Sequence, residues 1–217
     1  MRLGLDADEV LTTTRSVRKR LDLERPVERE VIEECLDIAL QAPTGSNAQG
    51  WQWVFVTDPE KKKVIADFYG ANYDKYTNRP DQPQYGVDDP RTAQRPKIMD
   101  SSRYLREIFH QVPVMMIPCI QGQGRLDSGV PTFGQASAWG SILPAVWSFM
   151  LALRERGLGS AWTTLHLPNE KEVADLLGIP FDTVTQAGLF PIAYTTGTDF
   201  KLAKRLPGSD LSHWDEW

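Results

Sequence analysis

The sequence ASAWGSILPAVWSFMLAL, residues 136–153, contains no charged side chain. It is about as long as the shortest helices that span a membrane, but three serines, Gly140 and Pro144 weaken membrane insertion. A helix that is apolar on all sides is buried in a globular protein, and a subunit of 217 residues has little room for one. We therefore expect residues 136–153 to form a buried helix at an oligomer interface, in a protein that does not enter a membrane.

The segments on either side of this helix alternate between helical and extended patterns. Amphipathic spacing, capping residues and proline positions predict helices over residues 7–13, 28–41, 59–69, 99–110 and 169–177. Runs of β-branched and aromatic residues predict strands over residues 51–57, 112–120, 158–164 and 183–195. Because the longest and most apolar helix lies in the middle of the chain, we expect an α+β fold. In that fold, residues 1–217 form one domain with a mixed sheet flanked by helices, not a doubly wound nucleotide-binding fold.

The composition narrows the function classes. The chain carries 29 Asp and Glu against 24 Lys and Arg, a formal net charge of −5, so it gains no general counterion-release affinity and no nucleic-acid partner is expected. The two cysteines, Cys35 and Cys119, lie in apolar stretches and are expected to be buried thiols, not a disulfide framework or a metal motif. The first residues contain no apolar signal-peptide segment, so a cytoplasmic protein is expected.

Side chains that commonly carry catalysis are not grouped in this sequence. The three histidines have no metal-site spacing among themselves or with the cysteines. His166 follows a predicted strand, where it could face a pocket, but a surface position is the simpler expectation. The sequence also contains no phosphate-loop motif, no nucleophile-elbow motif and no paired carboxylates that stand out as a dyad. We expect no metal and no catalytic side chain.

Residues 70–96 lose the apolar period and are dominated by Tyr, Asn, Asp, Gln, Arg and Pro. An irregular segment of this length inside a compact domain is usually functional or disordered. We therefore predict an irregular segment here that has a functional role.

Two polar segments suggest ligand contacts. Arg15-Ser16-Val17-Arg18 offers two guanidinium groups and a hydroxyl that can bracket a phosphate, although alone it fits a solvated basic turn better. The loop Pro-Thr-Gly-Ser-Asn-Ala-Gln at 43–49 has small residues that allow close approach, and Asn47 and Gln49 carry both donors and acceptors. It also fits an ordinary connection between a helix and a strand.

Two more segments are ambiguous in the same way. Gly157 fits a helix C-cap, and Gly159 fits either packing or a close backbone approach at the start of a strand. The pair Lys204-Arg205 before Pro207 fits either an added phosphate contact or a soluble tail.

The order of these segments is more specific than any one of them. Arg-Ser-Val-Arg at 15–18, PTGSNAQGWQWVFV at 43–56, a long variable middle, an apolar helix closing on GLGSAW at 157–162, and a basic residue before Pro207 together resemble the nitroreductase-like flavoprotein family. The resemblance covers nearly the whole chain. It implies a mainly antiparallel sheet in an α-β-α sandwich, and FMN bound at the interface of a homodimer. Residues 70–98 would be a variable insertion, which we hypothesise to be a lid over the flavin.

By position, the resemblance implies phosphate contacts for Arg15, Ser16 and Arg205, and a place near the pyrimidine edge of the flavin for Arg18. The remaining cofactor-binding residues that it implies are Pro43, Thr44, Ser46, Asn47, Gln49, Thr164 and Leu165. Asn47 and Gln49 would contact ring or ribityl atoms, and the backbone near Thr164 and Leu165 would approach flavin N5. In many relatives part of the loop at 43–46 serves the flavin of the partner subunit, and the C-terminal tail would embrace the partner.

The sequence departs from the family pattern at two positions. Gly50 stands where the motif usually has proline, and Ala203 stands where a second basic residue usually precedes Arg205. Lys201 and Lys204 are the candidates to compensate for Ala203.

The resemblance implies an oxidoreductase in which the flavin carries the chemistry. NADH or NADPH would reduce it, and a small acceptor such as a nitroaromatic compound or a quinone would reoxidise it in a ping-pong reaction. Two alternatives remain open. One is another flavin reaction on the same fold, such as dehalogenation, dehydrogenation or flavin cleavage, and the other is a flavin-binding dimer without turnover.

Overall fold

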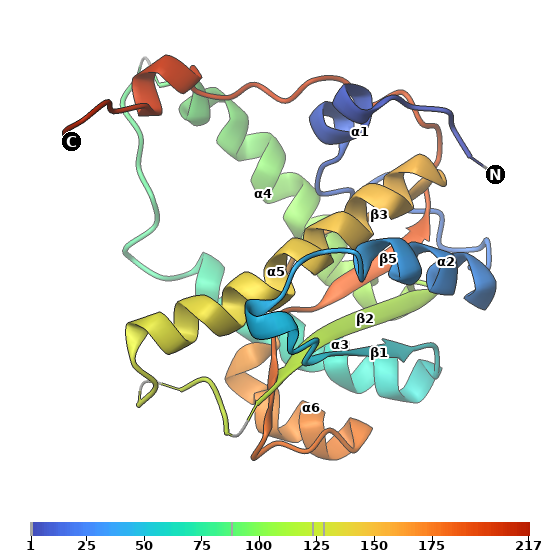
Figure 1. Ribbon diagram of the computed structural model, residues 1–217. Helices are drawn as coiled ribbons and strands as arrows, with labels where there is room; N and C mark the ends of the chain where they lie inside the picture. The colour runs from blue at the N-terminus through green and yellow to red at the C-terminus, as the bar shows by residue number, and fades with distance from the viewer. Residues whose placement is uncertain (1, 88, 123, 128) are drawn as a thin grey trace.

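The computed structural model describes residues 2–87, 89–122, 124–127 and 129–217, and it has the α-β-α sandwich that the sequence predicts (Figure 1). Its helices are α1 (Ala7–Thr13), α2 (Arg29–Ala39), α3 (Pro59–Thr77), α4 (Pro90–Ile108), α5 (Thr132–Glu155) and α6 (Glu170–Leu177). Its strands are β1 (Trp51–Val56), β2 (Val114–Gln121), β3 (Leu158–Ser160), β4 (Val184–Gln186) and β5 (Phe190–Tyr194).

The sheet is antiparallel between all of these strands, in the order β1-β2-β5-β3, and β4 pairs with the end of β2 beyond β5. Strand β2 is buried on both faces because helices cover both sides of the sheet. Its successive side chains point to opposite sides. Val114, Met116 and Ile120 pack toward α2 and α5, whereas Met115 and Ile117 pack toward α3, α4 and α6. The two cores on either side of β2 hold the three layers together.

Helix α5 lies across one face of the sheet, in contact with α2 and β2 (Figure 1). Among the described residues it is the one helix long and apolar enough to cross a membrane by length and composition, and 44% of its most apolar window is buried inside the subunit. The outer face of α5 is exposed at Phe133, Ala136, Gly140, Pro144 and Trp147. These positions recur every three or four residues and therefore form one apolar stripe along the helix.

The expectation that residues 70–96 are irregular is wrong. Helix α3 continues to Thr77 and α4 already begins at Pro90, so among the described residues of this part of the chain only 78–87 and 89 lie outside helices. The Asp89 side chain caps the start of α4 by accepting a hydrogen bond from the Arg91 amide. Pro96 lies inside α4, where proline normally breaks a helix. Few side chains in the first half of α4 are buried, so no apolar period marks it in the sequence.

Two predicted strands are shorter than expected. The strand predicted over 158–164 ends at Ser160, and the strand predicted over 183–195 is divided into β4 and β5. Thr163 and Leu189 pair with each other through two backbone hydrogen bonds. The chain after β3 therefore leaves the sheet and crosses the turn between β4 and β5.

Gly159 on β3 brings the N-terminal segment close to the sheet. The Val17 amide donates to the Ser160 carbonyl at 2.8 Å, and Ser16 forms a parallel bridge with Ser160. A Cβ atom at position 159 would lie 2.8 Å from Thr195 Cγ2 and 2.9 Å from Val17 Cβ. Gly159 therefore allows a close backbone approach and is not explained by packing alone. This approach places Arg15 and Arg18 beside β3.

We predict that Gly159→Ala lowers the free energy of unfolding by about 1–3 kcal/mol, because overpacking forces the backbone of β3 and the segment at 15–18 apart. Urea denaturation measures this loss. Gly86→Ala is the matched control, since a Cβ there meets nothing within 4 Å. Equal stability of the two variants would show that the contact at Gly159 is not restrictive.

Candidate functional site

A cationic cavity of about 640 Å³ lies between the N-terminal segment, α4 and the start of the C-terminal tail. It is lined by Arg15, Ser16, Val17, Arg18, Lys19, Arg20, Lys97, Ser101, Asp199, Phe200 and Lys201. Lys19 pairs with Asp100, and Arg20 pairs with Asp199 at 2.6 Å. Within the described ranges, the other four cations lining it have no carboxylate partner, so the cavity presents uncompensated positive charge.

Arg15 has few hydrogen-bond partners for a partly buried cation. Its Nε donates a long hydrogen bond of 3.5 Å to the Thr13 carbonyl, and its Nη2 is buried without a partner in the part of the chain that the structure describes. Burial lowers the pKa of Arg15, and the nearby charge of Arg205 lowers it further. An anionic ligand would accept a hydrogen bond from the unpaired N–H, which is costly to leave buried without a partner. It would also offset the repulsion between the Arg15 and Arg205 charges.

A second cavity, of about 320 Å³, adjoins the first and is called here the ring cavity. It is lined by Arg18, by α3 and α4, and by the segment after β3; these residues are Arg18, Tyr69, Tyr73, Tyr76, Thr77, Ile98, Met99, Ser102, Trp162, Thr163, Thr164 and Leu165. Aromatic and aliphatic walls with a few polar groups are typical of sites for planar ligands.

Arg18 lines both cavities. Its Nη1 donates to Ser101 Oγ at 3.3 Å. Burial lowers the pKa of Arg18, and Tyr69 and Tyr73 partly oppose this change. Burial also raises the pKa of Tyr69 to about 12, so the phenol remains protonated at neutral pH. A fixed guanidinium therefore stands at the junction of the two cavities.

Thr164 and Leu165 contribute backbone donors to the ring cavity. No group in the described ranges accepts a hydrogen bond from either amide. These N–H groups are therefore free for a ligand. The structure brings together Arg18, Thr164 and Leu165 in the ring cavity, and Arg15 and Ser16 in the adjoining one.

The loop at 43–49 lies elsewhere in the subunit and lines neither cavity. Its Gly45 amide donates to Ser141 Oγ of α5 at 3.0 Å. Ser46, Asn47 and Gln49 are exposed and have left-handed backbone angles, with φ of 52°, 54° and 51°. Such angles are uncommon for these residues and cluster at functional sites. The structure therefore does not bring Pro43, Thr44, Ser46, Asn47 and Gln49 together with the residues that line the two cavities.

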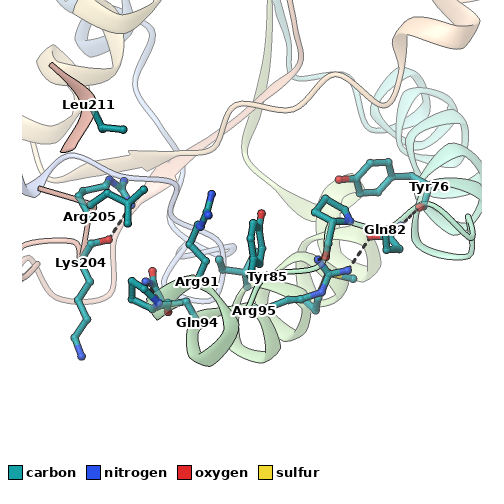
Figure 2. A pocket seen from close by; sticks show the side chains of 14 residues that line it. Tyr76, Gln82, Tyr85, Arg91, Gln94, Arg95, Lys204, Arg205 and Leu211 are labelled. Carbon is teal, nitrogen blue, oxygen red and sulfur yellow. Dashed lines mark hydrogen bonds between the residues drawn. The ribbon is translucent and has the colours of Figure 1, made fainter. Parts of the chain in front are cut away.

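Arg205 lines neither cavity. It lies in a third, neighbouring groove between α4 and the tail (Figure 2), although its charge still reaches Arg15. Of the two candidates to compensate for Ala203, Lys201 lines the cationic cavity and Lys204 lines the third groove.

Gly50, the other departure from the family pattern, has a local cause. The Gln121 amide donates to the Gly50 carbonyl at 2.7 Å. A Cβ atom at position 50 would lie only 2.8 Å from the Gln121 carbonyl oxygen, so a proline would force the two strands apart.

Several lining residues were not identified from the sequence. Lys97, Met99 and Ser102 lie in α4, whose first half has no apolar period to mark it. Trp162 belongs to the GLGSAW motif and Tyr73 to the Tyr-rich segment, but neither was expected to line the site. The chemical signal for Lys97 was only its charge, which most surface residues share.

The expectation of a surface position for His166 is wrong, because its side chain is fully buried. His166 Nε2 and Gln186 Oε1 are 3.1 Å apart, and Gln186 is held by Glu170 through a 2.8 Å bond from the Gln186 amide. Burial lowers the pKa of His166 to about 4, and the bond to Gln186 opposes this only in part. The imidazole is therefore neutral, directly after the free amides of Thr164 and Leu165.

These features fit an FMN. The buried unpartnered Nη2 of Arg15 and the uncompensated cations of the first cavity suit a phosphate. The planar walls and free amides of the ring cavity suit the flavin ring. The described residues contain no group of three or more His, Cys, Asp or Glu side chains able to hold a metal ion.

The nitroreductase family model matches residues 11–194, so the chain belongs to the nitroreductase family. Its fold is that of a nitroreductase-family flavoprotein. Over 185 residues the chain is 26% identical to the iodotyrosine deiodinase of Thermotoga neapolitana, covering 85% of this chain and 86% of that protein.

Two solved structures share the fold. The FMN and NADPH-dependent nitroreductase NfnB from Sphigopyxis sp. strain HMH has a TM-score of 0.68 and 22% identity, with 98% of this chain and 100% of that chain covered. An oxidized iodotyrosine deiodinase bound to FMN and 3-iodo-L-tyrosine has a TM-score of 0.62 and 22% identity, with 92% and 94% covered.

We predict that acid destabilises the protein through His166. The unfolded chain takes up a proton near the ordinary pKa of 6.5, but the folded chain only near 4. The contribution of neutral His166 to the free energy of unfolding is therefore complete above pH 6.5 and is lost as the pH falls toward 4. His166 alone lowers the free energy of unfolding by about 2 kcal/mol when the pH falls from 7.5 to 5. Urea denaturation at both pH values should show a shallower pH dependence for His166→Gln than for the wild type.

His110→Gln is the control, because it makes the same replacement at an exposed histidine. An unchanged pH dependence in His166→Gln would contradict the assignment of a neutral buried imidazole.

Proposed function

We propose that this protein is an FMN-dependent oxidoreductase that transfers electrons from NADH or NADPH to a small aromatic or quinone-like acceptor. The observation that carries the proposal is that Arg18 lines both cavities. One cavity suits a phosphate, and the other suits a planar ring. A ligand that is anionic at one end and planar at the other spans them past this guanidinium, which is the layout of a flavin mononucleotide.

Each residue at the site has a defined task in this proposal. Bound FMN would accept a hydride and pass its electrons on. Arg15 and Ser16 would hold the phosphate, with added charge from Lys201 and Arg205. Arg18 would stabilise negative charge gained by the ring on reduction, and positioned donors of this kind contribute roughly 2.7–4 kcal/mol. The amides of Thr164 and Leu165 would orient the ring, while Trp162 would shield it from water.

We propose further that the protein is a homodimer. The apolar stripe on α5 is exposed in the subunit, and the strained polar loop at 43–49 lies against the same helix. If two α5 helices pack together, that loop can reach the partner's ring cavity. Dimer formation would therefore complete the cofactor site as well as bury the stripe.

Reductive dehalogenation is the second candidate, because the chain is 26% identical to an iodotyrosine deiodinase. Iodide release from 3-iodo-L-tyrosine by the reduced protein would favour it. Reduction of a nitroaromatic compound or a quinone without iodide release would favour the first candidate.

The purified protein should be yellow, and NADH or NADPH should bleach it in a stopped-flow experiment. We predict that Arg18→Gln retains flavin but is reduced about 100-fold more slowly, because one charge-stabilising donor is lost. Arg103→Gln, at an exposed position of α4 outside both cavities, should behave like the wild type. A colourless protein would contradict the proposal, and a yellow protein that neither donor bleaches would indicate a flavin-binding module.

We predict that Trp147→Asp dissociates the dimer, since it places a charge on the exposed stripe of α5. Light scattering after size-exclusion chromatography gives the mass directly. Val64→Asp is the matched control, because Val64 and Trp147 are both 38% exposed. A monomeric wild type, or a dimer unaffected by Trp147→Asp, would exclude this interface.

A further inference from the structure

A third hollow, the tail groove, extends from the ring cavity toward the C-terminus. It has a volume of about 470 Å³ and lies between the end of α3, residues 82–85, the first half of α4 and residues 204–211 (Figure 2). Tyr76, Ile98 and Met99 line both the tail groove and the ring cavity. The two hollows are therefore direct neighbours, and one extended ligand can reach both.

Three guanidinium groups line the tail groove, and none of its described lining residues carries a carboxylate. Arg95 donates to the Pro83 carbonyl at 2.6 Å and to Gln82 Oε1 at 3.0 Å, both neutral acceptors. Arg205 makes only a 3.5 Å contact with the Lys204 carbonyl. Arg91 is ion-paired with Asp89. Among the described lining residues, Arg95, Lys204 and Arg205 have no carboxylate partner, so the groove keeps a net positive charge.

Arg91 is held in place before any ligand arrives. Its Nε and Nη2 donate to the carboxylate of Asp89, with the shortest bond 2.6 Å. Its guanidinium also stacks on the Tyr85 ring at 4.3 Å from the centroid, and the two side chains stand together in Figure 2. Nη1 is left free within the described ranges. A fixed guanidinium with a free Nη1 can donate a charge-assisted hydrogen bond to a phosphate oxygen.

The walls of the groove suit an aromatic base. Tyr76 and Tyr85 provide ring faces, and Pro83 and Ile98 provide apolar edges. The volume falls within the usual range for small-molecule sites. A small acceptor fits the ring cavity alone, so the ligand that fills both hollows must be long, planar at both ends and anionic.

We propose that the tail groove binds the adenosine 2′-phosphate end of NADPH and so selects NADPH over NADH. This inference rests on the proposed function, in which a nicotinamide donor enters the ring cavity. The two donors differ by one phosphomonoester, which carries a charge of about −1.5 to −2 at neutral pH. Arg91 would meet that phosphate, and Tyr85 or Tyr76 would stack on adenine.

Isothermal titration of the flavin-loaded protein with adenosine 2′,5′-bisphosphate and with adenosine 5′-monophosphate tests the groove without turnover. We expect the bisphosphate to bind at least about tenfold more tightly, a difference of 1.4 kcal/mol. Arg91→Gln should reduce this ratio toward one, while Arg91→Lys should retain part of it. Lys171→Gln on α6, outside the groove, should leave the ratio unchanged.

Equal binding of the two nucleotides by the wild type, or a ratio unaffected by Arg91→Gln, would overturn the inference. Loss of flavin from Arg91→Gln would also overturn it, because the groove would then serve the cofactor. A failure of the proposed function has a different signature: neither NADH nor NADPH would bleach the flavin, whatever the titration shows.

Discussion

The hydrogen bond between the Val17 amide and the Ser160 carbonyl determines where the charges of the N-terminal segment lie. It lets residues 15–18 run beside β3, and Gly159 permits this because no side chain stands between the two backbones. Arg15 and Arg18 then face the cavities rather than solvent. All other features of the candidate site, from Lys97 on α4 to Lys201 after β5, are arranged around this pair.

A cluster of cations is unfavourable unless something compensates it. Arg15, Arg20 and Arg154 lie close enough that the pKa of Arg154 is lowered, first by burial and then by the charges of Arg15 and Arg20. Arg154 is stabilised by hydrogen bonds to Thr13 Oγ1 and the Thr198 carbonyl. Arg15 has no comparable set of acceptors. Its position is explained if an anion completes the cluster, so the electrostatics of the free chain favour cofactor binding.

The parts of the fold with a strong apolar period were predictable from sequence. The helix at 28–41, the strand at 51–57 and the central apolar helix are found within a few residues of the expected bounds. The start of α4 was not predictable, because its side chains face a hollow and carry polar groups. His166 was misjudged for a related reason: its burial depends on Gln186, which lies 20 residues away in the sequence and meets it only in the folded chain.

The site was predictable in its motifs but not in its geometry. Arg15, Ser16, Arg18, Thr164 and Leu165 line adjoining cavities, whereas Arg205 lies in the next groove and the loop at 43–49 lies apart. Sequence spacing cannot distinguish residues that meet within a subunit from residues that meet across an interface. The separation of the loop from the cavities is therefore information that only the three-dimensional arrangement provides.

The most direct test compares the affinities of the apoprotein for FMN and for riboflavin, which differ only in the phosphate. We predict that FMN binds at least about 100-fold more tightly, because charge-assisted hydrogen bonds contribute about 1.5–3 kcal/mol each. Arg15→Gln should remove most of that difference. Equal affinity for the two flavins would contradict the assignment of the cationic cavity to a mononucleotide phosphate.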